Sequence, residues 1–379
     1  MPPLKGLNNR TERNEKPMRI GRYNLTKRAV WLCCSALMLV LALVCALMLV
    51  ALAHRLDSQR VAEYWRGESG ESFSQVSCFI PATSSVTRSE IYGFRYKVLE
   101  ALRVSGQAAD GTDGLWVDAW SREGKVKLTS SRASTDASAI AVGGDYFTFH
   151  RLHLLSGSYF RESDLMKDKV LLDEEMAWLL FGGTELEGMA IRINGQSFLV
   201  GGVVEREQDA ESRRAYTAGA GVYMSYDAYI TLTGDDRVDC YELVMAESVD
   251  GYTRQTAEAS FPLKGGEVVV NTGRYSLPRT IAHIPQLSDR AIQSNGIRYP
   301  YWENAARIVE DRCAILLIAV AVLLLPPLIT GIVYLVRLFR YGREALVEEL
   351  MPQVVGHVGE AVRVRRRRRW ERRQGRHGR

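Results

Sequence analysis

The sequence lacks the motifs on which most ATP-driven and hydrolytic chemistry depends. It has no Gly-x-x-x-x-Gly-Lys-Ser/Thr phosphate loop, so the chain cannot bind ATP by that device. It also has no Gly-x-Ser-x-Gly elbow, no His-Glu-x-x-His motif and no Cys-x-x-Cys pair. Acidic pairs such as Glu174 and Glu175 stand at the first turn of an expected helix, where the helix dipole favours negative charge. We therefore predict a protein that is not an enzyme and uses neither a cofactor nor a metal.

Cysteine and histidine are both scarce, with six of each. Four cysteines lie in or beside long apolar runs, which leaves Cys78 and Cys240 as the only pair in the rest of the chain. These two cysteines could form a disulfide or remain two separate buried thiols, and separate thiols are favoured. His150 and His153 have His-x-x-His spacing but no third or fourth ligand nearby, so surface or edge histidines are favoured over a metal site.

Two long runs contain no charge, residues 29–53 and 313–336. Each is long enough to cross a bilayer, which needs about 20 apolar residues. The first could be a signal peptide ending at Ala-Leu-Ala, but its core is far longer than a signal core, so an uncleaved anchor is favoured. Pro326 and Pro327 are expected to kink the second helix. The sequence therefore predicts two transmembrane helices.

The net charge differs in sign between regions of the chain. Residues 1–28 carry a net charge of +6 and residues 337–379 a net charge of +8, whereas residues 29–336 carry −9. Because positive flanks stay in the cytoplasm, we predict that both termini are inside and that residues 54–312 lie outside the cell membrane. The Arg-rich tail is then expected either to contact anionic membrane lipids or simply to determine the topology, and nucleic acid is not an expected partner.

The region between the runs has the pattern of an α+β domain. Residues 72–80 alternate as a strand, and Thr87 with Glu90 forms a capping box before an amphipathic helix, which together make half of a βαβ unit. Residues 114–131 indicate a hairpin with Ser-Arg-Glu-Gly as its turn, and further strands follow. The predicted fold is an extracytoplasmic α+β domain, with βαβ-type units and β-hairpins, flanked by two transmembrane helices.

Several single residues are predicted to shape this domain. Asn194 and Gly195 are the preferred two-residue hairpin turn, Gly182 ends a short helix, and Gly157 fits a structural turn. The last outer segment is expected to begin as a helix and run straight into the second span. Tyr299 and Trp302 suit the aromatic belt where the domain meets the membrane.

Three linked motifs resemble the periplasmic core domain of MacB-type ABC transporter permeases. They are "GGDYFTFHRLHLLSGSYFRESD", "KVLLDEEMAWLLFGG" and "GMAIRINGQSFLVGGVVE", in the family's order. The matching positions are Tyr146, Phe147, Leu155, Gly157, Phe160, Asp164, Val170, Leu171, Glu174, Ala177, Leu180, Phe181, Gly182, Gly188, Ile191, Ile193, Gly195, Phe198, Val200, Gly202 and Val203.

The resemblance implies a non-catalytic membrane subunit that couples a separate ABC ATPase to an outer domain, with a second permease chain as a further partner. The family has four spans and this sequence shows two, which raises the hypothesis of a truncated reading frame. By the same resemblance, the segment after the second span forms either the short helix that contacts the ATPase or an ordinary juxtamembrane helix, and both alternatives are open. The alternative is a bitopic sensor or scaffold that binds a ligand or an envelope protein outside.

Overall fold

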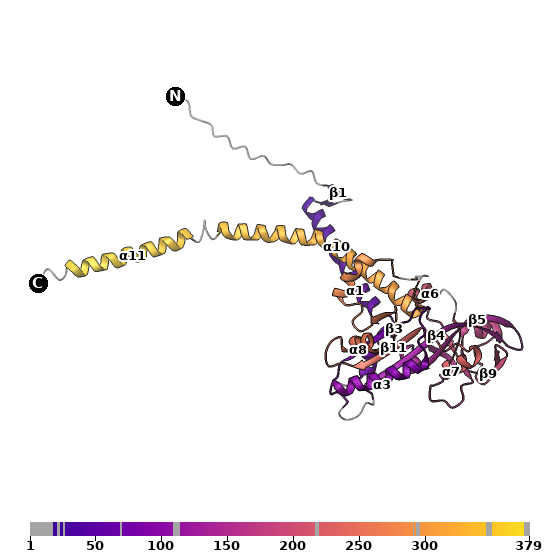
Figure 1. Ribbon diagram of the computed structural model, residues 1–379. Coiled ribbons are helices and arrows are strands. Elements are labelled where there is room, and N and C mark those ends of the chain that lie inside the picture. The colour runs from indigo at the N-terminus through magenta and orange to yellow at the C-terminus, as the bar shows by residue number, and fades with distance from the viewer. Residues whose placement is uncertain are drawn as a thin grey trace. The chain divides into compact units, whose positions relative to one another are not determined.

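The computed structural model describes residues 18–20, 23–25, 27–68, 70–108, 114–216, 220–290, 292, 296–345 and 351–374 (Figure 1). The chain divides into two compact units. One is Leu47–Leu317, here called the outer domain, and the other joins Met1–Ala46 to Ile318–Arg379.

The outer domain contains most of the secondary structure. Its strands are β3 (Phe73–Phe79), β4 (Trp116–Thr129), β5 (Ser134–Gly144), β6 (His153–Gly157), β7 (Lys169–Asp173), β8 (Ala190–Ile193), β9 (Gln196–Glu205), β10 (Ala220–Ser225), β11 (Cys240–Ala246) and β12 (Glu267–Val270). Its helices are η1 (Asp57–Gln59), α2 (Val61–Arg66), α3 (Arg88–Val104), α4 (Tyr146–Phe149), α5 (Glu174–Leu180), α6 (Ala210–Ala215), α7 (Tyr226–Thr233), α8 (Tyr252–Ser260), α9 (Leu277–His283) and η2 (Ile284–Gln286).

The ten strands of this domain form one mixed sheet in the order β12-β3-β11-β4-β5-β10-β7-β9-β6. Strand β8 pairs with both β4 and β9. The pairings β4–β5, β5–β10, β10–β7, β7–β9, β9–β8 and β8–β4 therefore return to their starting strand, so one half of the sheet closes on itself. The other half, with β12, β3 and β11, stays open.

The open half contains the expected βαβ unit in split form. Strands β3 and β4 are parallel because each pairs antiparallel with β11, which lies between them. Helix α3 connects them and begins at the predicted capping box, in which Glu90 accepts from the backbone N–H of Thr87 at 2.8 Å. Its buried face covers one side of the sheet. The predicted α+β fold class is confirmed.

Residues 114–131 do not form the hairpin that the sequence predicts. They lie in β4, a single strand of 14 residues. Ser121 to Gly124 stay extended because β5 pairs with all four residues and β11 also pairs with Ser121. Gly124 has a packing role, since a Cβ atom there would lie 1.9 Å from the Tyr229 hydroxyl. The polar residues before Gly124 indicated a turn, but pairing with the neighbouring strands keeps the backbone of this segment extended.

The turn residues adopt the expected conformations. Asn194 and Gly195 join β8 to β9 with φ of 47° and 89°, and the Asn194 side chain accepts from the backbone N–H of Lys127 at 2.8 Å. Gly182 follows α5 with φ 82°. At Gly157, with φ 75°, a Cβ atom would lie 2.1 Å from the carbonyl oxygen of Gly201, so the close approach of two strands requires glycine.

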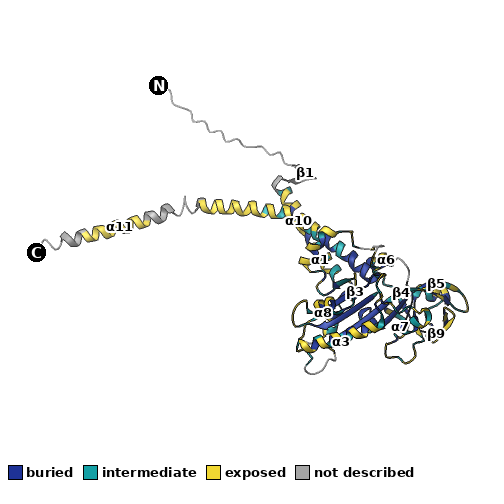
Figure 2. Ribbon diagram, in the orientation of Figure 1, coloured by how far each residue is buried: buried dark blue, intermediate teal, exposed yellow. Residues whose placement is uncertain are grey.

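The sheet separates two apolar cores, and buried residues lie on both faces (Figure 2). Cys78 and Tyr241 belong to one core, while their strand neighbours Phe79 and Cys240 belong to the other. The two cysteines therefore point to opposite faces. Both are buried free thiols, so the alternative of a Cys78–Cys240 disulfide is not realised.

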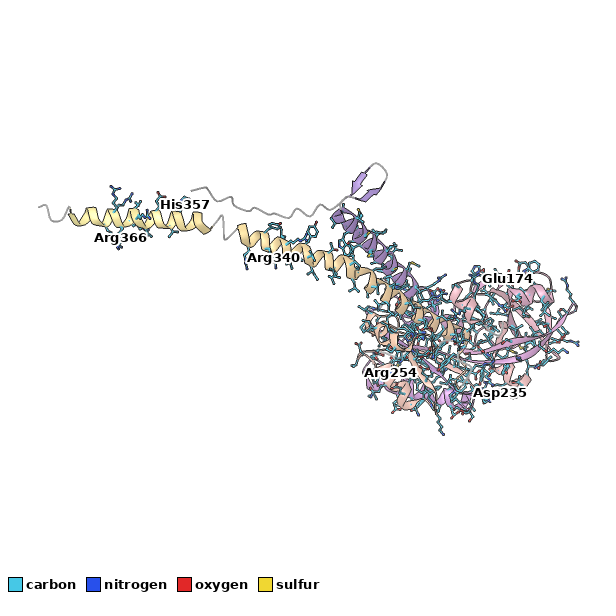
Figure 3. All side chains as sticks on the ribbon, turned by 90° about the horizontal axis from the view of Figure 1, so that it is seen from above. Glu174, Asp235, Arg254, Arg340, His357 and Arg366 are labelled. Carbon is cyan, nitrogen blue, oxygen red and sulfur yellow. The ribbon has the colours of Figure 1, made fainter. Side chains whose placement is uncertain are left out.

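The remaining elements include the two apolar helices. Helix α1 covers Lys27–Ala53 and helix α10 covers Tyr301–Ala345, with Pro326 and Pro327 inside it. Both contain windows apolar and long enough to cross a membrane, with mean hydropathy 3.0 and 2.7. Short strands β1 (Met18–Ile20) and β2 (Tyr23–Leu25) precede α1, and α11 (Met351–Gln374) follows α10. Figure 3 labels Arg340 on α10, and His357 and Arg366 on α11, all of them exposed.

Candidate functional site at the root of helix α10

Helix α10 begins inside the outer domain and not at a membrane surface. Residues 301–309 are all buried, so the helix is enclosed on every side for more than two turns before the charge-free run begins at Cys313. Its apolar side chains join the core on one face of the sheet. We call residues 301–312 the root of α10. As the sequence predicts, this helix continues unbroken into the apolar segment.

Trp302 and Tyr299 are not the lipid-facing aromatic residues that the sequence suggested. Trp302 is 2% exposed, and its ring lies 4.3 Å from that of His150 and 5.9 Å from that of Tyr146. Tyr299 is half-buried, and its hydroxyl donates to Glu267 Oε2 at 2.5 Å. The expectation failed because the helix starts about 18 Å before the apolar run, at 1.5 Å per residue, so these rings lie inside the domain.

A buried ion network surrounds the root. Glu303 is fully buried and accepts two hydrogen bonds from Arg274, at 2.7 and 2.8 Å, in a bidentate pair. It also accepts from Arg307 Nε, one helical turn further on, at 2.7 Å. Arg274 donates through Nε to Glu310 at 2.8 Å. Two guanidinium groups and two carboxylates therefore join the α10 root to the segment that follows β12.

A second layer of charge surrounds this centre. Glu267, on edge strand β12, accepts from Arg307 at 2.8 Å and from Arg290 at 3.0 Å. Burial alone would raise the pKa of Glu267, but the hydrogen bond from Tyr299 and the charge of Arg307 outweigh it and lower the pKa. The pKa of Arg274 is raised because the nearby carboxylates outweigh its burial. The network thus favours the charged forms of Glu267 and Arg274.

Neutral groups extend the network into the sheet. Gln59 Oε1 accepts from Arg274 at 2.9 Å and from Asn271 Nδ2 at 3.0 Å. Ser77, on β3, lies within hydrogen-bond distance of both Asn271 and Glu242. These contacts connect η1, β3, β11 and the segment after β12 to the helix root. Movement of the root would break several buried hydrogen bonds, so root and sheet should move together.

His150 ends this chain of contacts, and its position corrects a prediction. The sequence favoured a surface or edge residue, but His150 is buried, with its Nε2 atom 2.6 Å from Glu242 Oε2. The prediction rested on the lack of a third or fourth ligand nearby, which argues against a metal site but does not determine burial. His153 lies on edge strand β6, exposed, with Glu205 at 2.9 Å. The two histidines do not converge, and the described residues contain no group of three or more metal-ligating side chains.

The sequence analysis missed most of this site. Glu303, Arg307 and Glu310 follow the i, i+4, i+7 spacing of one helix face, directly before a charge-free run, and that pattern was a usable signal. No such signal marked Arg274, Gln59 and Asn271, because only the fold brings these residues to the helix from distant parts of the chain. Within the part of the chain that the structure describes, the site consists of paired guanidinium and carboxylate groups. It fixes a membrane helix firmly in a folded domain.

Comparison with known proteins identifies the family. The profile of the MacB-like periplasmic core domain matches residues 35–262, more than half of the chain. The chain belongs to this family. It is therefore a membrane protein of the kind found among ABC transporter permeases, with an extracytoplasmic-type domain between two apolar helices. A search of curated protein sequences found no match.

Two solved structures are similar to the outer domain. The extracellular domain of the ABC-type transporter YknZ from Gram-positive bacteria is 18% identical, covering 52% of this chain and all of that one, with a TM-score of 0.36. The periplasmic region of MacB from Actinobacillus actinomycetemcomitans is 16% identical, covering 59% of this chain and 98% of that one, with a TM-score of 0.39.

Proposed function

We propose that this chain is a non-catalytic subunit of an ABC-type transporter that couples a separate ATPase to its outer domain. In this proposal both termini lie in the cytoplasm and residues 54–312 lie outside, because the basic flanks stay inside. A second permease chain is expected, since two helices alone do not enclose a pathway. Family membership supports the permease role.

The observation that carries the coupling role is the continuity of α10. One helix runs from Tyr301 to Ala345, through the apolar run and beyond it. Its root is held by the Arg274–Glu303 pair, and removing one partner of such a buried pair is strongly destabilising. In this proposal the apolar run and the root belong to one helix with no loop between them, and this continuity supports transmission of a displacement from the membrane to the sheet.

The test is an affinity purification of the full-length chain from its native membrane, followed by mass spectrometry. We expect an ABC ATPase in the eluate, and its loss when residues 343–351 are deleted. The matched control replaces the basic residues of 365–369 with glutamine, which removes charge from the tail but leaves residues 343–351 intact. An eluate that never contains an ATPase would contradict the proposal.

A sensor that binds a ligand outside is the second candidate, and one observation favours it. The outer domain has an open cavity of about 310 Å³ beside edge strand β12, lined by Val268, Val270, Arg274, Arg279, Arg290 and Glu310 among others. Among the described residues, Arg279 donates to the backbone carbonyls of Val270 and Thr272 and pairs with no carboxylate, so its charge is available to an anion. Two results together would favour this function. A small anionic ligand would raise the melting temperature of the full-length chain, and the affinity purification would recover no ATPase.

A further inference from the structure

A second cavity lies where the two apolar helices enter the outer domain. Its volume is about 590 Å³, within the range of ligand pockets. Its walls are Met48, Ala51 and Leu52 from the end of α1, and Ile315 and Leu316 from α10. Three charged residues complete the lining, namely Arg55, Glu211 and Arg312. The cavity is therefore apolar along the helices and charged at the end nearest the domain.

The charges at this end do not balance. Glu211, on α6, is fully buried, and its carboxylate pairs with Arg55 at 3.4 Å and also with Arg312. Two guanidinium groups thus share one carboxylate, which leaves one net positive charge. The side chains of Arg55 and Arg312 are still 46% and 39% exposed. Each guanidinium has five N–H donors, so both can take a further acceptor while they hold Glu211.

The position of the cavity matches the boundary of a bilayer. Arg55 stands two residues after α1 ends at Ala53, and Arg312 directly precedes the charge-free run at Cys313. Both guanidinium groups therefore lie at the edge of the hydrocarbon core, where lipid phosphates lie, and the apolar walls extend toward the acyl chains.

We propose that this cavity binds an anionic phospholipid of the leaflet facing the outer domain. Its phosphate lies between Arg55 and Arg312, and one acyl chain lies along Ala51 and Ile315. A phosphate suits two guanidinium groups because each can donate two hydrogen bonds to it. An apolar helix from a partner chain fits less well, since it would remove both exposed charges from water without replacing their hydrogen bonds.

The bound lipid would act on α10, which the ion network also holds. Glu211 connects Arg55, just after α1, to Arg312 at the end of the α10 root. A phosphate at this point adds a second bridge between them, so the affinity of the chain for its partners could depend on membrane composition. The lipid site itself needs neither ATP nor a partner, so its test is independent of the proposed function.

Native mass spectrometry of the full-length chain, titrated with phosphatidylglycerol or phosphatidylcholine in detergent, tests the proposal. We expect phosphatidylglycerol to bind about tenfold more tightly, a difference of about 1.4 kcal/mol. Both lipids offer a phosphate to the two arginines, but only phosphatidylcholine also carries a quaternary ammonium, which the guanidinium groups repel. The double variant Arg55→Gln, Arg312→Gln should lose this preference. The matched control Arg213→Gln, Arg214→Gln removes two exposed charges of α6 that do not line the cavity, and should keep it.

Two further arms make the result decisive. Ala51→Trp fills the apolar part of the cavity without changing its charge. It should weaken the binding of phosphatidylglycerol but not that of inorganic phosphate. If the Arg55/Arg312 double variant does not fold, Ala51→Trp replaces it. The lipid proposal would be overturned in favour of a simple anion site by two results together: millimolar inorganic phosphate displaces phosphatidylglycerol, and Ala51→Trp leaves the binding of phosphatidylglycerol unchanged. Equal binding of the two lipids, or an equal loss in the Arg213/Arg214 control, would also overturn it.

Discussion

Replacing Arg274 with methionine should destabilise the outer domain far more than the same change at a surface arginine. Methionine keeps the volume of the arginine stem but removes the charge and four hydrogen bonds, two of them to Glu303. Glu303 would stay fully buried with Arg307 as its remaining cationic partner. Breaking a buried pair in this way costs about 3–5 kcal/mol of folding free energy. For a domain of this size that is a fall in melting temperature of about 6–20 °C.

Arg254→Met is the matched control. Arg254, labelled in Figure 3, pairs with Glu258 on the surface of α8 at 2.7 Å, and its side chain is 56% exposed. Such a pair contributes about 0–1 kcal/mol, so the melting temperature should fall by less than about 4 °C. Glu303→Gln should be intermediate, because Arg274 keeps Glu310 and Arg307 keeps Glu267.

The assay is thermal unfolding of the full-length chain in lipid nanodiscs, followed by intrinsic tryptophan fluorescence, with all three variants measured at the same pH and salt. Equal falls for Arg274→Met and Arg254→Met would refute the reasoning, because the buried network would then contribute no more than an exposed pair.

Three other measurements test the fold. Gly157→Ala should lower the free energy of unfolding by about 2–5 kcal/mol, because the added Cβ would meet a strand carbonyl. Gly195 has positive φ but open space around it, so Gly195→Ala should lower it by about 1–2 kcal/mol, and Gly195→Val by more. Equal losses for Gly157→Ala and Gly195→Ala in denaturant unfolding would contradict the close approach at Gly157. Burial and the charge of Asp239 raise the pKa of Glu123 to about 7, above its value in the unfolded chain. The free energy of unfolding should therefore fall as pH rises from about 4.5 to 7. Glu123→Gln should remove that part of the pH dependence. Cys78 and Cys240 should resist maleimide until the chain unfolds, and reductant should leave the melting temperature unchanged; fast labelling or a shift would show that the thiols are exposed or paired.

Local signals in the sequence predicted local structure well. The capping box at Thr87, the Asn194–Gly195 turn and the helix stop at Gly182 depend on neighbours within a few residues, and all three are present. The fold class also followed from periodicity and from three motifs in a fixed order. The hairpin predicted around Gly124 failed because its conformation is set by strands β5 and β11, which are distant in the sequence.

The candidate site was harder to predict, because its members come together only in the folded chain. Arg274 and Gln59 lie 215 residues apart in the sequence, and nothing in the pattern around either one indicates the other. Trp302 was assigned to the membrane interface because an aromatic residue near an apolar run usually lies there. Only the position at which α10 begins shows that this ring belongs to the core.

Hydrogen–deuterium exchange tests the coupling claim most directly. The full-length chain, purified with its ATPase in nanodiscs, would be compared with and without a non-hydrolysable ATP analogue. We predict that the analogue changes exchange in residues 267–312, which include the α10 root and the segment bonded to it. Inserting four glycines after Arg312 should abolish that change while the ATPase stays bound. Identical exchange with and without the analogue, or a change that survives the insertion, would contradict transmission through α10.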